Sequence, residues 1–185
     1  MSKVCVFLAN GFEEIEALTV VDLLRRVKIE VSTISISREQ YVTGAHQIIV
    51  KADEVFEQVD FNKVDMLVLP GGMPGTKNLD AHIGLEQLLN KFRIEGKRIA
   101  TICAAPSVLG AKGLLEGKAA TCYPGFEGVL KGATIKSEDV VVDGNIITSK
   151  GMGTAIDFSL ELIKILLDEE TAVKTAASIQ YSHYN

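Results

Sequence analysis

Hydrophobic positions follow two different spacings along this chain. Continuous apolar runs and β-branched stretches are typical of strands that are buried on both faces of a sheet. Apolar residues spaced three and four apart predict helices instead. On this basis strands are predicted at residues 4–8, 30–36, 66–69 and 98–102, and helices at 15–28, 85–96, 106–115 and 156–167.

Turn signals add two hairpins and a last helix. Residues 41–50 predict a short hairpin at a sheet edge, turned near Gly44, and residues 140–147 predict another around Asp143-Gly144. The acidic run that starts at Asp168 is favourable at the positive end of a helix, so it predicts the start of a final helix.

Alternating strands and helices predict one α/β domain over residues 1–185, with a mostly parallel sheet covered by helices on both faces. In such sheets ligands bind outside the carboxyl ends of the strands. The informative segments are therefore the loops that follow three of the strands, at residues 10–16, 70–75 and 103–106.

Composition narrows the possible settings and partners. The 185 residues carry a net charge of -5 without a Lys/Arg cluster, so a nucleic-acid site is not expected. Cys5, Cys103 and Cys122 have no zinc-site spacing and are odd in number, so we expect neither a metal nor a disulfide framework, and we expect a reducing, cytoplasmic setting. The N-terminal apolar run is too short for a signal peptide, and no run approaches the roughly 18 apolar residues that cross a membrane.

Cys103 is the candidate nucleophile. It follows a predicted buried strand, and the small Ala104 and Ala105 and the helix-starting Pro106 suit a sharp turn from strand to helix. The helix N-terminus is expected to favour the thiolate and lower the thiol pKa. The alternative is an unreactive cysteine in the core.

Glu16 and the glycines after the third strand could assist this thiol. Glu16 falls among apolar residues, where burial would raise its pKa and keep it protonated beside a thiolate, whereas Glu13 and Glu14 suit a solvated helical turn. Gly71 and Gly72 offer backbone N–H groups for an oxyanion. The alternatives are a surface carboxylate and an ordinary turn.

Histidine is the usual base for a nucleophilic cysteine, yet none of the three histidines is near Cys103 in sequence. His82 is expected to be solvated at a helix start, and His183 lies in the C-terminal tail. His46 lies in the first hairpin, where a surface position is expected, although it could reach a site in its own chain or across an interface. An orthodox Cys-His protease or amidase is therefore disfavoured.

Several segments together resemble the ThiJ/PfpI superfamily, and within it the branch of the Parkinson-disease-associated deglycase and its bacterial relatives. The matching segments appear in the family's order at residues 6–16, 68–72, 100–106, 120–124 and 148–154. The resemblance implies a flavodoxin-like three-layer α/β sandwich, related to that of class I glutamine amidotransferases, and a homodimer.

The resemblance also implies roles for individual residues. Cys103 matches the family's oxidation-prone elbow cysteine, Glu16 its carboxyl partner, and Gly72 an oxyanion donor, with the Ala104 N–H as companion. Tyr123 stands where the human relative has histidine, so a base role there is in doubt. In the segment at residues 148–154, Lys150 replaces a common arginine, which could alter a dimer contact. Directly after the cysteine, Ala104 stands where the protease branch has histidine, which disfavours peptidase activity.

The leading hypothesis is a cofactor-independent, cysteine-dependent glyoxalase or deglycase. It would act on α-oxoaldehydes such as methylglyoxal, or on their early adducts with protein side chains, in defence against carbonyl and oxidative stress. The alternative is a peroxide-responsive sensor or chaperone that uses the same oxidisable cysteine. A role in a thiamine pathway is disfavoured because Pro70-Gly71-Gly72 lacks the Gly-Lys-Ser/Thr of a phosphate-binding loop.

Overall fold

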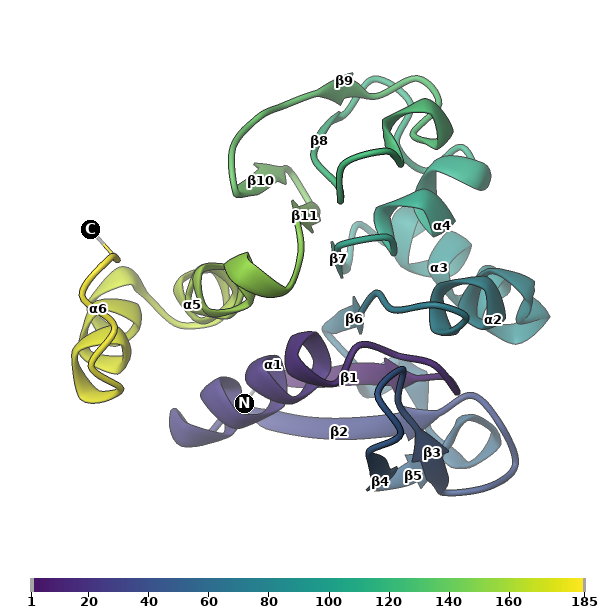
Figure 1. Cartoon of the computed structure of the whole chain (residues 1–185), viewed down its shortest axis with the longest axis horizontal. Helices are drawn as coiled ribbons and strands as arrows, with labels where there is room; N and C mark the ends of the chain where they lie inside the picture. The colour runs from purple at the N-terminus through teal and green to yellow at the C-terminus, as the bar shows by residue number, and fades with distance from the viewer. Residues whose placement is uncertain (1, 185) are drawn as a thin grey trace.

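A computed structural model describes residues 2–184 and has a seven-stranded sheet between two layers of helices (Figure 1). The strand order is β10-β11-β7-β6-β1-β2-β5, and all neighbours are parallel except β10 and β11. The sheet strands are β1 (Lys3–Leu8), β2 (Glu30–Ser35), β5 (Glu54–Val55), β6 (Met66–Leu69), β7 (Arg98–Ile102), β10 (Val140–Asp143) and β11 (Ile146–Ser149). The helices are α1 (Glu14–Arg26), α2 (Gly75–Ala81), α3 (Ile83–Ile94), α4 (Pro106–Ala111), α5 (Ala155–Leu166) and α6 (Glu169–Ser178).

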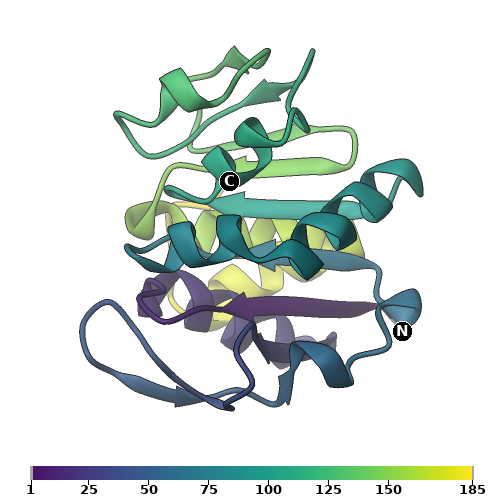
Figure 2. The same ribbon diagram turned by 90° about the vertical axis from the view of Figure 1, so that its right-hand side faces the viewer.

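Two separate apolar cores lie on the two faces of the sheet. Alternate side chains of β1 divide between them: Val4 and Val6 join the core under α1, α5 and α6, while Cys5 and Phe7 join the core under α3 and α4. Figure 2 shows α2, α3 and α4 in front of the sheet and the yellow helices α5 and α6 behind it. The predicted three-layer architecture with a mostly parallel sheet is confirmed.

The structure confirms several predicted elements and corrects others. The hairpin around Gly144 and the last helix are present, and the Asp168 side chain caps that helix by accepting a hydrogen bond from Thr171 N. The first hairpin, β3 (Tyr41–Thr43) and β4 (Ile49–Lys51), is not an edge of the main sheet but forms its own two-stranded sheet. The edge beside β2 belongs to β5, which sequence analysis missed. The helix predicted at 106–115 ends at Ala111, close to Gly113 in a left-handed conformation (φ 68°).

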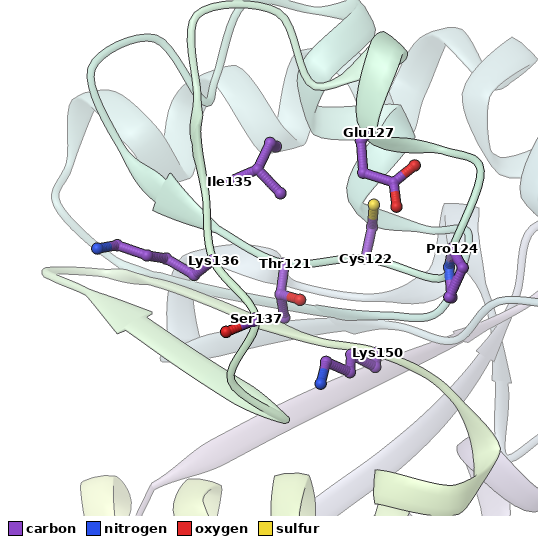
Figure 3. Close-up of a pocket in the computed structure, with 8 residues that line it drawn as sticks. All are labelled: Thr121, Cys122, Pro124, Glu127, Ile135, Lys136, Ser137 and Lys150. Atoms are coloured by element: carbon purple, nitrogen blue, oxygen red, sulfur yellow. The ribbon is translucent and has the colours of Figure 1, made fainter.

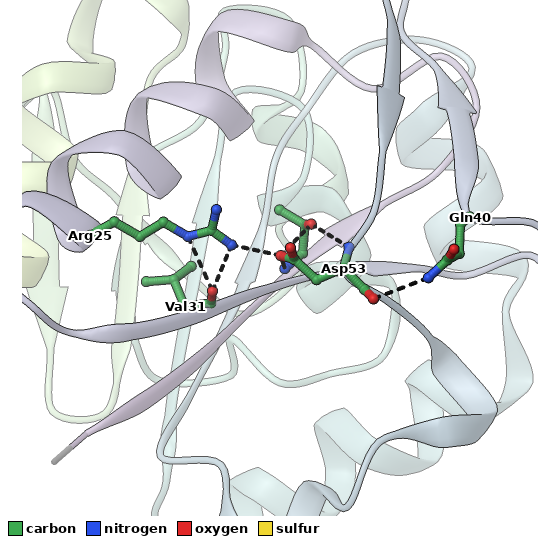
Figure 4. A network of polar contacts seen from close by, with 5 residues as sticks. Arg25, Val31, Gln40 and Asp53 are labelled. Carbon is green, nitrogen blue, oxygen red and sulfur yellow. Dashed lines mark hydrogen bonds and ion pairs between the residues drawn. The ribbon is translucent and has the colours of Figure 1, made fainter.

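A polar network on α1 and β2 holds the chain that leads into β5 (Figure 4). Asp53 accepts hydrogen bonds from the backbone N and the hydroxyl of Thr33, both at 2.8 Å. It also forms an ion pair with Arg25 at 2.6 Å. Arg25 also donates to the carbonyl of Val31. Burial alone would raise the pKa of Asp53, but the Thr33 hydrogen bonds and the Arg25 charge lower it, so the carboxylate stays ionised.

Smaller elements complete the chain. A second two-stranded sheet pairs β8 (Ala119–Ala120) with β9 (Thr134–Ile135). Single 3-10 turns occupy Phe56–Gln58, Phe61–Lys63, Glu127–Val129 and Met152–Thr154. None of the helices between residues 2 and 184 combines the length and apolar character that a membrane span requires.

The sheet order brings three loops of interest together. The chain passes from β1 to β2 on one side and later to β6 and β7 on the other, so the order reverses between β1 and β6. In parallel sheets such a reversal opens a crevice at the carboxyl ends. The loops after β1, β6 and β7 therefore lie beside one another at that edge, as the sequence predicted.

Candidate active site

Cys103 lies on a sharp turn between β7 and α4. Its backbone is left-handed (φ 64°), a conformation that is strained for a residue with a side chain. Two hydrogen bonds hold the turn: Cys103 N donates to Ser149 O at 2.9 Å, and Tyr123 N donates to Cys103 O at 2.8 Å. Cys103 is partly exposed, whereas Cys5 and Cys122 are 0% and 5% exposed. The geometry is that of a nucleophile elbow with one accessible thiol.

Glu16, on the first turn of α1, is buried at 1% exposure. Its Oε2 accepts a hydrogen bond from Gly71 N at 2.8 Å. Its Oε1 is buried without a conventional hydrogen-bond partner among the described residues. The thiol of Cys103 lies beside this carboxyl group, and the interaction between the two shifts both pKa values. The carboxyl group therefore has an oxygen free to exchange a proton.

Gly71 is the residue that allows this approach. A Cβ at Gly71 would lie 2.7 Å from Cys103 Cβ, 2.8 Å from Glu16 Oε2 and 3.1 Å from Ala104 N. No side chain fits there, because real Cβ contacts are longer. Glycine at this position thus sets the separation between the nucleophile turn and the carboxyl group.

Gly72 and Ala104 present backbone N–H groups to the sulfur. Hydrogen bonds from both act to lower the pKa of the Cys103 thiol. Gly72 itself has φ 89°, and a Cβ there would collide with the backbone of Glu13 and Gly11. Of the N–H groups predicted for an oxyanion, those of Gly72 and Ala104 thus converge on the nucleophile, whereas Gly71 N donates to Glu16 Oε2 instead.

Burial governs the charges at the site. It raises the pKa of Glu16 from 4.5 to about 7. Burial and then the Glu16 charge raise the pKa of the Cys103 thiol to about 12, against the opposing Ala104 and Gly72 N–H groups. The Ala104 N–H at the start of the helix acts in the predicted direction, but the predicted net lowering of this pKa is wrong, because desolvation and a neighbouring carboxylate outweigh it. The pair favours a thiol beside a carboxylate that is half ionised near neutral pH, which suits Glu16 as a general base.

Glu14 is the residue that sequence analysis placed wrongly: it is buried at 2% exposure rather than solvated. It accepts hydrogen bonds from His46 N at 2.7 Å and pairs with His46 Nδ1 at 2.8 Å. Burial alone would raise the pKa of Glu14, but the bonds from His46 lower it, and the pKa of the exposed His46 is raised in turn. A Cβ at Gly44 would overlap the Glu14 carboxylate, so this glycine admits it. In the sequence, the Gly44-Ala45-His46 turn was the signal that could have indicated a carboxylate partner for His46.

Potential metal-binding atoms occur in one group of the described chain. Ligand atoms of Glu13, Glu14 and His46 lie within 4.8 Å of one another. The Glu14 carboxylate already accepts backbone N–H groups and the His46 ring, so these atoms act on each other as an ion pair.

The other two histidines lie in other parts of the fold. His82, predicted to be solvated, caps α3 by accepting a hydrogen bond from Leu85 N at 2.9 Å and packs on Phe56 with ring centroids 4.6 Å apart. Burial lowers its pKa. His183 packs edge-on against Tyr181 near the C-terminus. The group that the fold brings to Cys103 is thus a carboxyl group.

A surface cavity is lined by another thiol, that of Cys122 (Figure 3). Its volume is about 320 Å³, and its lining comprises Thr121, Cys122, Pro124, Glu127, Ile135, Lys136, Ser137 and Lys150. Cys122 points toward Glu127 in this view, and burial raises the pKa of its thiol to about 11. Lys150 pairs with Asp139 at 2.9 Å. Cys103 is not among the residues that line this cavity.

A flavodoxin-like α/β sandwich with a cysteine elbow, a buried carboxyl group and converging N–H groups defines a class of cysteine-centred α/β proteins. A family model described as the DJ-1/PfpI family matches residues 2–165. The chain belongs to this family, which confirms the resemblance read from its motifs.

Individual relatives agree with this assignment. The chain is 38% identical to Protein DJ-1 homolog B of Arabidopsis thaliana over 96% of its length, but spans only 41% of that relative. It is 32% identical to Deglycase PfpI of Pyrococcus furiosus, covering 89% of this chain and 99% of the relative. The solved structure of oxidized DJ-1 of Toxoplasma gondii superposes with a TM-score of 0.95 at 37% identity, over 99% of this chain and 100% of that chain.

Proposed function

We propose that the chain is a cysteine-dependent enzyme that converts α-oxoaldehydes such as methylglyoxal, or their early adducts with protein side chains, into hydroxy acids. The observation that carries the proposal is the contact of a partly exposed elbow thiol with a buried carboxyl group whose pKa is about 7. Relatives named deglycase, including the Pyrococcus furiosus protein, support an enzymatic role.

The first step forms a carbon–sulfur bond. The Glu16 carboxylate takes the thiol proton as the Cys103 sulfur attacks the aldehyde carbon, and the aldehyde oxygen becomes an oxyanion held by the Gly72 and Ala104 N–H groups. Transfer of the proton from Glu16 to this oxygen gives a hemithioacetal. The step consumes no reagent other than the aldehyde.

The second step moves hydrogen between neighbouring carbons. Glu16 removes the proton from the carbon bound to sulfur and, through an enediol, returns it to the adjacent carbon, which produces a thioester and a hydroxyl group. Water then cleaves the thioester, releasing the hydroxy acid and restoring the Cys103 thiol. For methylglyoxal the net reaction is aldehyde plus water giving lactate and a proton, and every group used belongs to this chain or to water.

The test is turnover of methylglyoxal to lactate by the wild type, Cys103→Ser and Glu16→Gln. Losing a general base typically costs about 100- to 10,000-fold, so Glu16→Gln is expected to fall in that range and Cys103→Ser to reach background. Cys122→Ser is the matched control, because it removes a thiol from the separate cavity and should retain turnover. Wild-type turnover no faster than that of Cys103→Ser would refute the proposal.

We also propose that two copies associate through α1 and the β3–β4 hairpin. Large apolar side chains are exposed there: Ile15 at 51%, Ile48 at 52% and Ile49 at 64%. The hairpin is fixed to the start of α1 because Ala45 N donates to Phe12 O at 2.8 Å. Sedimentation equilibrium is expected to give a dimer for the wild type and a monomer for Ile49→Lys, and a monomeric wild type would contradict the interface.

The burial of the three thiols also favours a second candidate function, peroxide sensing at Cys103. Among the three cysteines only Cys103 is more than 5% exposed. Reaction with two peroxide molecules would give a sulfinate and two waters. Mass analysis after mild peroxide should place two added oxygens on Cys103 alone. Equal oxidation of Cys5 and Cys122 would argue against this role.

A further inference from the structure

Tyr123 lies beside Cys103, and the mechanism above gives it no part. Its side chain is 50% exposed, which is unusual for a large ring beside a reactive group. Its backbone N donates to Cys103 O at 2.8 Å, so the ring is tied to the nucleophile turn itself. The Tyr123 backbone is therefore held beside the turn that carries the sulfur.

Gly151 shows how close the ring lies to the sulfur. A Cβ built on Gly151 would be 3.3 Å from Cδ2 of Tyr123, 3.8 Å from its Cε2 and 3.9 Å from Cys103 Sγ. The ring and the thiol thus border the same small strip of glycine backbone. Because Gly151 has no side chain, nothing of its own fills the space between them.

Two other sides of the Cys103 side chain are already occupied. Gly71 and Glu16 close one side so tightly that a single added Cβ at Gly71 would lie 2.7 Å from Cys103 Cβ. The N–H groups of Gly72 and Ala104 occupy the oxyanion side. The substituent of a carbonyl compound bound to the sulfur can extend across Gly151, over the Tyr123 ring.

We propose that Tyr123 is a specificity-determining residue that selects α-oxoaldehydes whose substituent is aromatic or otherwise flat and apolar. This rests on the proposed function, since it concerns the substituent of the aldehyde that Cys103 attacks. A pair of aromatic rings in contact gains attraction beyond simple burial, equivalent to a preference of roughly two- to tenfold. A methyl substituent is too small to gain much from the ring.

The test compares phenylglyoxal with methylglyoxal in the wild type, Tyr123→Ala and Tyr123→Phe. Tyr123→Ala is expected to lower kcat/KM for phenylglyoxal roughly fivefold, mainly through KM, and to change that for methylglyoxal less than about twofold. Tyr123→Phe keeps the ring and should behave as the wild type. Ile94→Ala, which removes an exposed apolar side chain from the last residue of α3, away from the proposed interface and from the end of β7 that carries the thiol, is the control.

Two outcomes of the kinetics would overturn the proposal. One is an equal loss for both aldehydes in Tyr123→Ala, which would indicate a general effect on the thiol. The other is a Tyr123→Phe variant as impaired with phenylglyoxal as Tyr123→Ala, which would assign the effect to the hydroxyl group. Matching thermal melting curves for the variants exclude a loss of folding.

A binding measurement separates this proposal from the proposed function. Mandelate and lactate, the aromatic and aliphatic hydroxy acids, are tested for protection of Cys103 against alkylation by iodoacetamide. Mandelate should protect Cys103 at a lower concentration than lactate does in the wild type. In Tyr123→Ala the two acids should protect at similar concentrations. If the wild type turns over neither aldehyde, the catalytic proposal fails, but this protection difference still supports the ring as a binding surface. Equal protection by the two acids in the wild type overturns it.

Discussion

Replacing Glu16 by Gln should change how stability depends on pH, and the size of the change follows from burial. Burial raises the pKa of Glu16 from 4.5 to about 7, and the side chain is 1% exposed, so solvent screens this effect little. The folded protein therefore holds the proton more tightly than the unfolded chain does. Between about pH 4.5 and 7, unfolding releases a proton, and the wild type loses stability as the pH rises.

The magnitude comes from the same two pKa values. A rise from 4.5 to about 7 corresponds to about 3 kcal/mol, at about 1.4 kcal/mol for each pH unit. Gln has the same shape and can still accept the hydrogen bond from Gly71 N, but it does not ionise. The free energy of unfolding of Glu16→Gln minus that of the wild type should therefore grow by about 3 kcal/mol between pH 4.5 and 8.

Urea unfolding at several pH values measures this difference, and groups that titrate alike in both proteins cancel. Cys103→Ser is the companion variant: it removes the thiol but leaves the burial of Glu16, the largest cause of the raised pKa. When Cys103→Ser is compared with the double variant Glu16→Gln/Cys103→Ser, most of the pH dependence of the stability difference should persist. A difference between wild type and Glu16→Gln that stays constant from pH 4.5 to 8 would refute the assignment of a buried, proton-exchanging carboxyl group.

Three further predictions concern the elbow, a helix cap and the hairpin. Gly72→Ala forces a side chain into a left-handed position (φ 89°) against backbone, so thermal melting should show a loss of at least about 1–3 kcal/mol together with lost turnover; unchanged melting would argue against the collision. Asp168→Ala removes the cap on Thr171 N and should cost about 1 kcal/mol in urea unfolding without affecting turnover. The pKa of His46 is raised by Glu14, so its NMR titration should have a midpoint above pH 6.5. The protonated ring should stabilise the hairpin at lower pH, and this stabilisation should be lost as the pH rises through the folded-state pKa. Glu14→Gln should lower the midpoint, and a wild-type midpoint at or below 6.5 would contradict the pairing.

The layered fold was predictable because burial dominates its pattern. β1 and β6 are buried along almost their whole length, so their apolar runs mark them without any knowledge of their neighbours. β5 was missed because it has only two residues and is held by Asp53, Thr33 and Arg25, which are far apart in sequence. The hairpin at Gly44 was found as a local turn, but its separation from the main sheet depends on that same long-range arrangement.

The candidate site, like the fold, could be predicted only where its signals are local in sequence. The residue types and their loops were predictable, since a cysteine before small residues and proline, and glycines after a strand, are local signals. The pKa of the thiol could not be predicted, because it depends on how deeply the thiol is buried and how closely Glu16 approaches it. Both arise from packing between α1, β6 and β7, which Gly71 permits. The same holds for Glu14, whose burial needs the missing side chain of Gly44.

The corrected charge distribution also changes which residue initiates the proposed reaction. A thiolate held by a helix N-terminus would attack without assistance and would leave the carboxyl group only a proton to donate. A thiol beside a carboxylate with a pKa of about 7 cannot attack until that carboxylate accepts its proton. Reactivity of Cys103 should then follow the ionisation of Glu16, and the backbone N–H groups of Gly72 and Ala104 are free to stabilise the oxyanion once the sulfur charge moves to the carbonyl oxygen. In the proposed mechanism the buried carboxyl group, more than the helix behind the elbow, therefore sets the pH at which Cys103 reacts.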